Sequence, residues 1–175
     1  MRSYQMRQKL FSLRDQFRIR DAEGNDVYVV KGRLISIRDR FSFEDVHGRE
    51  LLGIRQKLVS WRLQYRIYCG GRLCAIVQKR LLSVLGSRFV ISIKGEPNLL
   101  AKGNFLDYEY RFVRRGRQVA QVSKRWFTLA DSYGVQVDEE SVGGLLILAC
   151  AVIIDMINHN PKREDLDVEP SGDRT

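Results

Sequence analysis

The sequence predicts a mainly β protein: a closed antiparallel barrel of about twelve strands around a central, buried hydrophobic C-terminal helix. Three observations lead to this prediction. Apolar and polar residues alternate from residue 17 to residue 137, turn signals interrupt the alternation, and a run of apolar residues and glycine extends from Val142 to Ile154. Alternation is typical of half-buried strands, whereas a helix that is apolar on every face must be enclosed.

The strands are recognised by their alternation, which the stretch LQYRIYC shows most clearly. Alternate residues from Leu63 to Cys69 fall on one face, and Gln64, Arg66 and Tyr68 fall on the other. Side chains of a strand point to opposite faces in turn, so one face of this segment is expected to be buried.

The turns between the strands are marked by glycine, proline, aspartate and asparagine. Asp and Asn side chains accept hydrogen bonds from nearby backbone amides, and glycine supplies a positive φ, so these clusters predict hairpin turns. They lie around Gly24, Gly48, Gly70-Gly71, Pro97 and Gly116. Their spacing of about twenty to twenty-five residues fits two strands and a turn.

One hairpin is repeated along the chain. YRIYCGGRLCAIVQKRL, which begins at Tyr65, aligns without a gap with YRFVRRGRQVAQVSKRW, which begins at Tyr110, and eight of the seventeen residues are identical. A fainter copy, FEDVHGRELLGIRQKL, precedes them. The repeated unit is a hairpin whose second strand ends in basic residues, although any two antiparallel hairpins share part of such a pattern.

The apolar run is predicted to form a helix over about residues 139–159. The acidic stretch DEE suits a helix N-terminus, Ser141 can cap it, and Pro161 cannot continue it. A membrane span needs about twenty apolar residues, whereas this run has thirteen before Asp155.

The predicted barrel has room for this helix. About twelve tilted strands enclose a radius of about 12 Å, which their side chains alone do not fill. We therefore expect the helix inside the barrel. Asp155 is then a structural buried carboxylate that reaches solvent at the barrel mouth or accepts a hydrogen bond from an arginine there.

Residues 1–160 are predicted to form a single barrel domain, followed by an acidic, disordered tail over residues 161–175. Three cationic and five acidic side chains give the tail a net charge of −2. Because the whole chain has a net charge of +9, the body before the tail has a net charge of +11. Such a charge attracts phosphate-rich partners, either nucleic acid or an anionic membrane. The alternative is a solvated basic surface that only keeps the protein in solution.

The three cysteines lack metal-ligand spacing, and we expect reduced thiols in a cytosolic protein. Cys69 and Cys74 flank a glycine pair and could face each other across a hairpin, but that compartment disfavours a disulfide. The first seventeen residues contain no continuous apolar segment, so no secretory signal is expected. The predicted location is cytoplasmic, peripheral to a membrane.

Several segments together resemble the LURP-one-related family. They are VYVVKG, FSFEDVHGRELLGIRQKL, YRIYCGGRLCAIVQKRL, AQVSKRWFTLADSYGVQV and the final apolar helix. The resemblance covers residues 4–159, and its most specific elements are the QK and SK strand ends and the pattern W-F-x-x-x-D-x-Y from Trp126 to Tyr133.

This resemblance implies the tubby C-terminal-like fold, a closed barrel of about twelve strands around a C-terminal helix, which the phospholipid scramblases share. Tubby domains bind phosphoinositide headgroups through basic residues on the barrel wall. Their lipid-binding motif has no residue-by-residue match in this chain, so the resemblance assigns no binding residue.

The candidate binding residues are therefore taken from the basic strand ends. They are Arg55, Lys57, Lys79, Arg80, Lys124 and Arg125. Arginine binds phosphate oxygens in bidentate fashion and lysine acts as a point charge, so these cations could hold a phosphorylated headgroup. Trp126 and Phe127 are predicted to enter a membrane interface beside them. The alternative is a core tryptophan with solvated cations.

The sequence contains no nucleophile elbow, phosphate-binding loop or metal-ligand cluster, so no catalytic residue, metal or cofactor is predicted. His47 and His159 are expected to be surface histidines. We predict a non-enzymatic cytoplasmic binding or scaffold module that recognises anionic phospholipid or phosphorylated headgroups. Nucleic-acid binding is less favoured, because no recognition helix or aromatic RNA-binding motif is visible. An enzyme with an unrecognised pocket is the third possibility.

Overall fold

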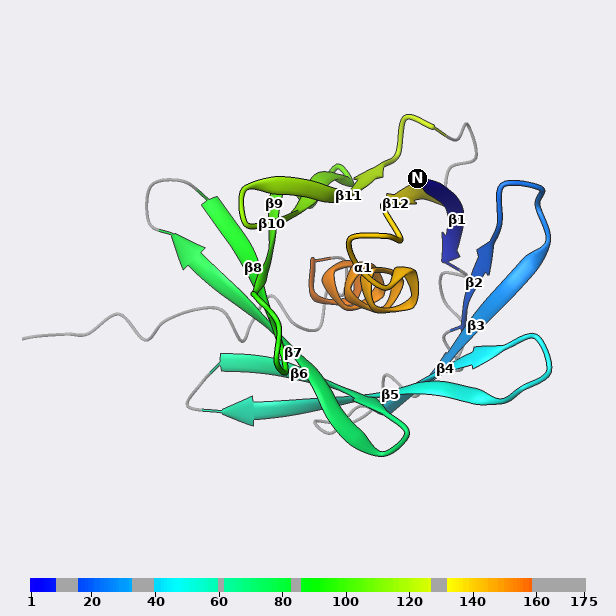
Figure 1. The fold of residues 1–175 in the computed structure, drawn as a ribbon, viewed down its shortest axis with the longest axis horizontal. Coiled ribbons are helices and arrows are strands. Elements are labelled where there is room, and N and C mark those ends of the chain that lie inside the picture. The colour runs from blue at the N-terminus through cyan, green and yellow to red at the C-terminus, as the bar shows by residue number, and fades with distance from the viewer. Residues whose placement is uncertain (9–15, 33–39, 60–61, 83–85, 127–131, 159–175) are drawn as a thin grey trace, which may run out of the picture.

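The computed structural model describes residues 1–8, 16–32, 40–59, 62–82, 86–126 and 132–158. Within them the chain forms twelve strands and one helix (Figure 1). The strands are β1 (Arg2–Gln8), β2 (Gln16–Arg20), β3 (Asp26–Gly32), β4 (Arg40–Asp45), β5 (Glu50–Val59), β6 (Arg62–Cys69), β7 (Arg72–Leu82), β8 (Gly86–Ile93), β9 (Leu99–Asn104), β10 (Glu109–Arg114), β11 (Arg117–Ser123) and β12 (Ser132–Val137). The helix α1 spans Gly144–Asn158.

The strands form a closed antiparallel barrel. Each strand pairs with its neighbours in sequence, and β1 pairs with β12 to complete the ring. The closing register runs from Arg2 opposite Val137 to Arg7 opposite Ser132. Closure leaves no strand edge unpaired, which removes the aggregation hazard of an open sheet. The predicted fold class, a closed barrel with a buried C-terminal helix, is confirmed.

The helix α1 occupies the interior of this barrel, and Figure 1 shows the strands surrounding it. Every residue from Ile147 to Ile157 is buried. The strands contribute inward side chains such as Phe43, Ile91 and Phe112, which are 0 % exposed. Burial of one large apolar side chain contributes about 1.5–3 kcal/mol, so the helix supplies much of the core. In the part of the chain described here, no helix has the length and apolarity that crossing a membrane requires.

The helix begins at Gly144, later than the start predicted near residue 139. The preceding residues form a turn in which the carboxylate of Asp138 accepts a hydrogen bond from the Ser141 hydroxyl at 2.7 Å. The carboxylate of Glu139 accepts a hydrogen bond from the Tyr4 hydroxyl at 2.7 Å. Two consecutive glycines follow, and they favour this turn over a longer helix. The hydrogen bond between Glu139 and Tyr4 therefore connects the turn that precedes the helix with β1.

The expectation of reduced thiols is wrong for two of the three cysteines. Cys69 and Cys74 are joined by a disulfide across the β6–β7 hairpin, and their Cα atoms are 6.0 Å apart. The tight Gly70-Gly71 turn brings the two residues within the range that a disulfide needs. Cys150 is free and buried in α1.

The contribution of the helix to the core can be measured with two valine variants. Val152 in α1 is 0 % exposed, whereas Val46 in the β4–β5 turn is 54 % exposed. We expect Val152→Ala to lower the free energy of unfolding by about 2 kcal/mol, because the lost methyl groups leave a cavity. Val46→Ala is the matched control and should change it by less than about 0.5 kcal/mol. Urea unfolding followed by circular dichroism measures both. Equal effects would contradict the role of α1 as the filling of the barrel.

Candidate functional site

Two of the six predicted cations, Arg55 and Lys57, lie on the outer wall of the barrel in β5. Both are exposed, and they alternate with the buried Leu52 and Ile54. The guanidinium carbon of Arg55 lies 4.7 Å from the centre of the Tyr68 ring. This cation–π contact orients the arginine while its nitrogen atoms stay available to solvent or to a ligand.

Lys79 and Arg80 are neighbours in β7 and point to opposite faces of the sheet. Lys79 is directly opposite Phe89, a residue that is 0 % exposed, so it lies on the inner face. Arg80 is opposite Arg88 and is exposed on the outer wall. The structure therefore places Arg80, and not Lys79, on the same surface as the β5 cations.

Lys124 and Arg125 follow the end of β11, and both are exposed. Arg125 lies 3.5 Å from the carboxylate of Glu109 through its Nε atom. The next residue, Trp126, is 38 % exposed and does not belong to the core. Phe127, the second predicted interface aromatic, lies outside the described residues.

The outer wall carries a line of four cations across four adjacent strands, which we call the cationic row. It consists of Arg80 in β7, Arg88 in β8, Lys102 in β9 and Arg111 in β10. Arg80 is opposite Arg88, and Lys102 is opposite Arg111. The β8–β9 pairing ends at Phe89 opposite Ala101, and Arg88 and Lys102 are the next residues of the two strands. Neighbouring strands are about 4.8 Å apart, so the row extends over about 14 Å.

The cationic row has no acidic partner within the described part of the chain. None of the ion pairs found there involves Arg80, Arg88, Lys102 or Arg111. The Nε atom of Arg88 is buried and has no hydrogen-bond partner. Like charges directly opposite each other in a sheet are destabilising. The row is therefore a costly arrangement for an isolated barrel, and an anion would relieve it.

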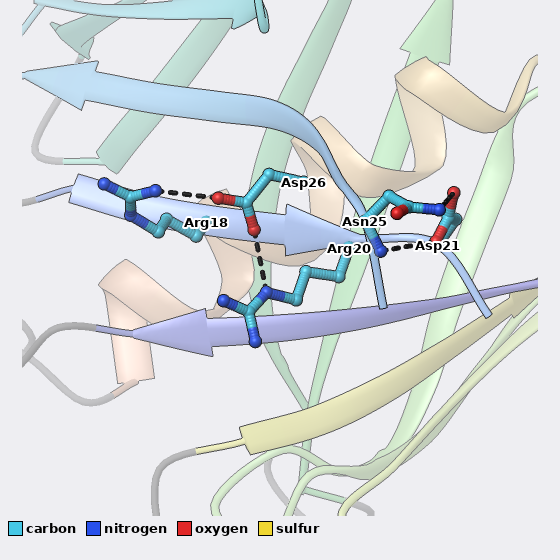
Figure 2. Close-up of polar contacts among 5 residues, drawn as sticks. All are labelled: Arg18, Arg20, Asp21, Asn25 and Asp26. Carbon is cyan, nitrogen blue, oxygen red and sulfur yellow. Dashed lines mark hydrogen bonds and ion pairs between the residues drawn. The ribbon is translucent and has the colours of Figure 1, made fainter. Parts of the chain in front are cut away.

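On β2 and β3, by contrast, the barrel neutralises its arginines, as Figure 2 shows. The carboxylate of Asp26 accepts hydrogen bonds from Arg18 and Arg20, both at 2.7 Å. These bonds, with the one from Arg20 the stronger influence, hold the pKa of Asp26 below its ordinary value. In the adjoining turn, the Asp21 carboxylate accepts hydrogen bonds from the backbone and side-chain nitrogens of Asn25. These arginines are matched controls for the cationic row.

A second group of cations, the arginine triplet, lies on β4, β5 and β6. It consists of Arg40, Arg55 and Arg66, where Arg40 is opposite Arg55 and Arg55 is opposite Arg66. The Nε atom of Arg66 donates a hydrogen bond to the side-chain oxygen of Gln64 at 3.1 Å. The triplet extends the basic surface of the outer wall towards β4.

Sequence reasoning missed most of these cations because it grouped residues by the ends of repeated strands. Arg88, Lys102 and Arg111 lie within their strands and not at the strand ends, and only the pairing register brings them together. Each has a buried apolar neighbour in its strand: Phe89 follows Arg88, Ala101 precedes Lys102, and Tyr110 and Phe112 flank Arg111. The alternation of each strand alone identifies these cations as outward residues. The pairing register of the strands is needed to show that they are aligned with one another.

The buried carboxylate of Asp155 forms a second polar site, near the C-terminal end of α1. It is 1 % exposed, and the Tyr108 hydroxyl donates a hydrogen bond to its Oδ1 atom at 2.7 Å. Tyr108 has a positive φ of 55° and its ring stacks on Tyr133, with 4.7 Å between centroids. On the solvent side, Lys124 Nζ lies 5.7 Å from the centre of the Tyr108 ring. The prediction offered solvent at the barrel mouth or an arginine as the partner of Asp155, whereas the carboxylate is buried and accepts from a tyrosine that the prediction did not include.

Tyr110 and Tyr133 also lie around Asp155. Burial, and then the nearby carboxylate, raise the pKa of both tyrosines well above the ordinary value. Both side chains therefore stay neutral in the folded protein. Within the described residues no cluster of histidine, cysteine and acidic side chains could hold a metal ion. The hydrogen bond from Tyr108 to Asp155 anchors the end of the helix to the β9–β10 turn.

Comparisons with known proteins agree with this fold. The family model described as LURP-one-related matches residues 2–155. A curated relative, "Uncharacterized protein YxjI" of Bacillus subtilis (strain 168), is 33 % identical over 163 residues, which cover 92 % of this chain and 96 % of the relative. An X-ray structure of a protein from Arabidopsis thaliana superimposes with a TM-score of 0.65 at 18 % identity. That match covers 90 % of this chain and 92 % of the plant protein.

The neutral tyrosines predict how stability depends on pH. Above about pH 10 the unfolded chain ionises its tyrosines, whereas the folded protein keeps Tyr110 and Tyr133 protonated, so the free energy of unfolding falls as pH rises. Each such group contributes a slope of up to about 1.4 kcal/mol per pH unit. Tyr133→Phe removes one group, and its stability should fall less steeply between about pH 10 and pH 11.

Urea unfolding at several pH values measures this slope. Val152→Ala, which changes no titratable group, is the control and should keep the wild-type slope. An unchanged slope in Tyr133→Phe would contradict a raised pKa for this side chain.

Proposed function

The chain belongs to the LURP-one-related family, and we propose that it is a non-enzymatic binding module whose cationic row recognises phosphate groups on anionic membranes. The observation that carries this proposal is the row itself: four aligned cations without an acidic partner among the described residues, one of them with a buried, unsatisfied Nε atom. The proposed location is the cytoplasmic face of a membrane, to which the protein binds peripherally.

The chemistry of the row suits phosphate oxygens. Arginine offers donors in a planar fork that pairs with two oxygens at once, and three of the four cations are arginines. Arg88 lies between Arg80 and Lys102, so a phosphate placed over it would be within reach of both neighbours. Such an anion would satisfy the buried Nε donor and screen the repulsion along the row.

A membrane surface supplies several phosphates along the length of the row. A cation near an anionic leaflet contributes about 1 kcal/mol, so the four residues together supply about 4 kcal/mol. In this proposal Arg55 and Lys57 extend the contact along the wall, and Lys124 and Arg125 add to it beyond β11. The inward position of Lys79 makes it the weakest of the six predicted candidates.

The exposed side chain of Trp126 favours a membrane surface, rather than a soluble anion, as the proposed ligand. That side chain is 38 % exposed, and Trp126 stands three residues beyond the end of β11. Arg111 in the row is opposite Gln121 in that same strand. Tryptophan is favoured where an apolar surface meets polar headgroups. We propose that Trp126, with Phe127, enters the interface while the cations bind phosphates.

Paired charge-neutralising variants test the proposal. In flotation assays with vesicles of phosphatidylcholine and phosphatidylserine, Arg80→Gln with Arg88→Gln should weaken binding about 30-fold, which is the loss of about 2 kcal/mol. The control, Arg18→Gln with Arg20→Gln, removes the same charge from arginines already paired with Asp26 and should weaken it less than about 3-fold. Because opposed cations repel, the row variant should be at least as stable as the wild type.

Two outcomes would contradict the proposal. Equal losses in both variants would show that net charge, and not the row, attracts the protein. The salt dependence provides the second comparison, since a nucleic-acid-binding protein loses affinity steeply with salt. Tighter binding to duplex DNA than to anionic vesicles at the same salt concentration would favour the nucleic-acid alternative.

A further inference from the structure

The disulfide lies beside the exposed turn of its hairpin. Figure 1 shows the β6–β7 turn at the periphery of the molecule, away from α1. Cys69 is exposed and Cys74 is half-buried, whereas Cys150 is fully buried. We propose that Cys69 and Cys74 form a reversible thiol–disulfide exchange site for low-molecular-weight thiols, with Cys69 as the sulfur that is attacked. This proposal is independent of the proposed membrane function.

The hairpin does not need the disulfide to keep its register. Backbone pairs continue on both sides of it, with Cys69 opposite Arg72 and Ile67 opposite Ala75. Cys74 is the additional residue of a β-bulge, and its carbonyl accepts a hydrogen bond from the Lys94 amide of the neighbouring segment at 3.0 Å. Opening the disulfide therefore leaves both cysteines held close together.

The surroundings of the two cysteines also favour the reduced state of the pair. The Sγ atom of Cys74 lies 3.2 Å from the carbonyl oxygen of Ile67, where the thiol formed on reduction can donate a hydrogen bond. The exposed Arg72, opposite Cys69, favours a thiolate at the tip through its positive charge. Each redox state thus has favourable surroundings, and both sulfurs stay in position to join again.

The exchange proceeds in two balanced steps. The thiolate of a small thiol attacks Cys69 Sγ, the Cys69–Cys74 bond breaks, and Cys74 leaves as a thiolate that takes a proton from water. A second thiolate attacks the small-thiol sulfur of the mixed disulfide, releasing Cys69 as a thiolate that is then protonated. The net reaction consumes two small thiols and yields two protein thiols and one small-molecule disulfide. Cys74 can instead attack Cys69 and expel the first thiol, which restores the original bond.

Glutathione is a suitable probe for the full-length protein. Native protein is incubated with reduced glutathione and alkylated, and peptide masses are measured. Cys69 and Cys74 should be labelled while Cys150 stays protected and the circular dichroism spectrum is unchanged. With oxidised glutathione, Cys74→Ser should form an adduct on Cys69 at least about tenfold faster than Cys69→Ser forms one on Cys74, because access limits exchange.

Three outcomes would overturn the proposal. Labelling of Cys69 and Cys74 only together with Cys150 would show that reduction requires unfolding, so that the disulfide is structural. Equal adduct rates in the two serine variants would show that access does not distinguish the two sulfurs, which removes the basis for choosing Cys69 as the attacked one. Two free thiols at the tip after incubation with oxidised glutathione would show that the pair does not form a stable disulfide.

Discussion

Enclosure of an apolar helix by its own barrel is the constraint on which the rest of this structure depends. A helix without a polar face must be surrounded, and the strands need a filling that their own side chains cannot supply. The enclosure requires the ring to close between β1 and β12, and it requires alternate residues of every strand to be apolar. It also explains the environment of Asp155, since a carboxylate inside the barrel must receive hydrogen bonds, one of which comes from Tyr108.

The same alternation explains the charges of the outer wall. Because the inner positions of each strand pack against the helix, the cations of a strongly basic chain occupy the outward positions. The register of neighbouring strands then decides whether such cations meet acidic residues or one another. Around Asp26 they meet a carboxylate, whereas on β4–β6 and again from β7 to β10 they are opposite further cations. This asymmetry distinguishes one part of the wall and makes it the candidate for ligand binding.

The fold could be predicted from the sequence because its signals are local: period-two alternation, turn residues and an apolar run that ends at Asp155. The site depends on register, which is not a local property. Bulges such as the one between Ile67 and Tyr68 shift the partner of every later residue. The grouping of Lys79 with Arg80 failed for a different, local reason: they are consecutive residues of β7, so one of them faces inward. The disulfide was missed because its prediction relied on the expected compartment, whereas the Gly-Gly turn decided the geometry.

Closure of the ring between β1 and β12 also has a consequence for biosynthesis. The first strand leaves the ribosome early, but its partner β12 is translated only after the ten strands between them, and the helix that fills the interior follows both. Until then the nascent chain presents an apolar inner surface and the unpaired edges of β1 and β11. Pairings this distant in sequence form slowly, and such surfaces attract chaperones or other nascent chains. The barrel can therefore complete its folding only after β12 and α1 have left the ribosome.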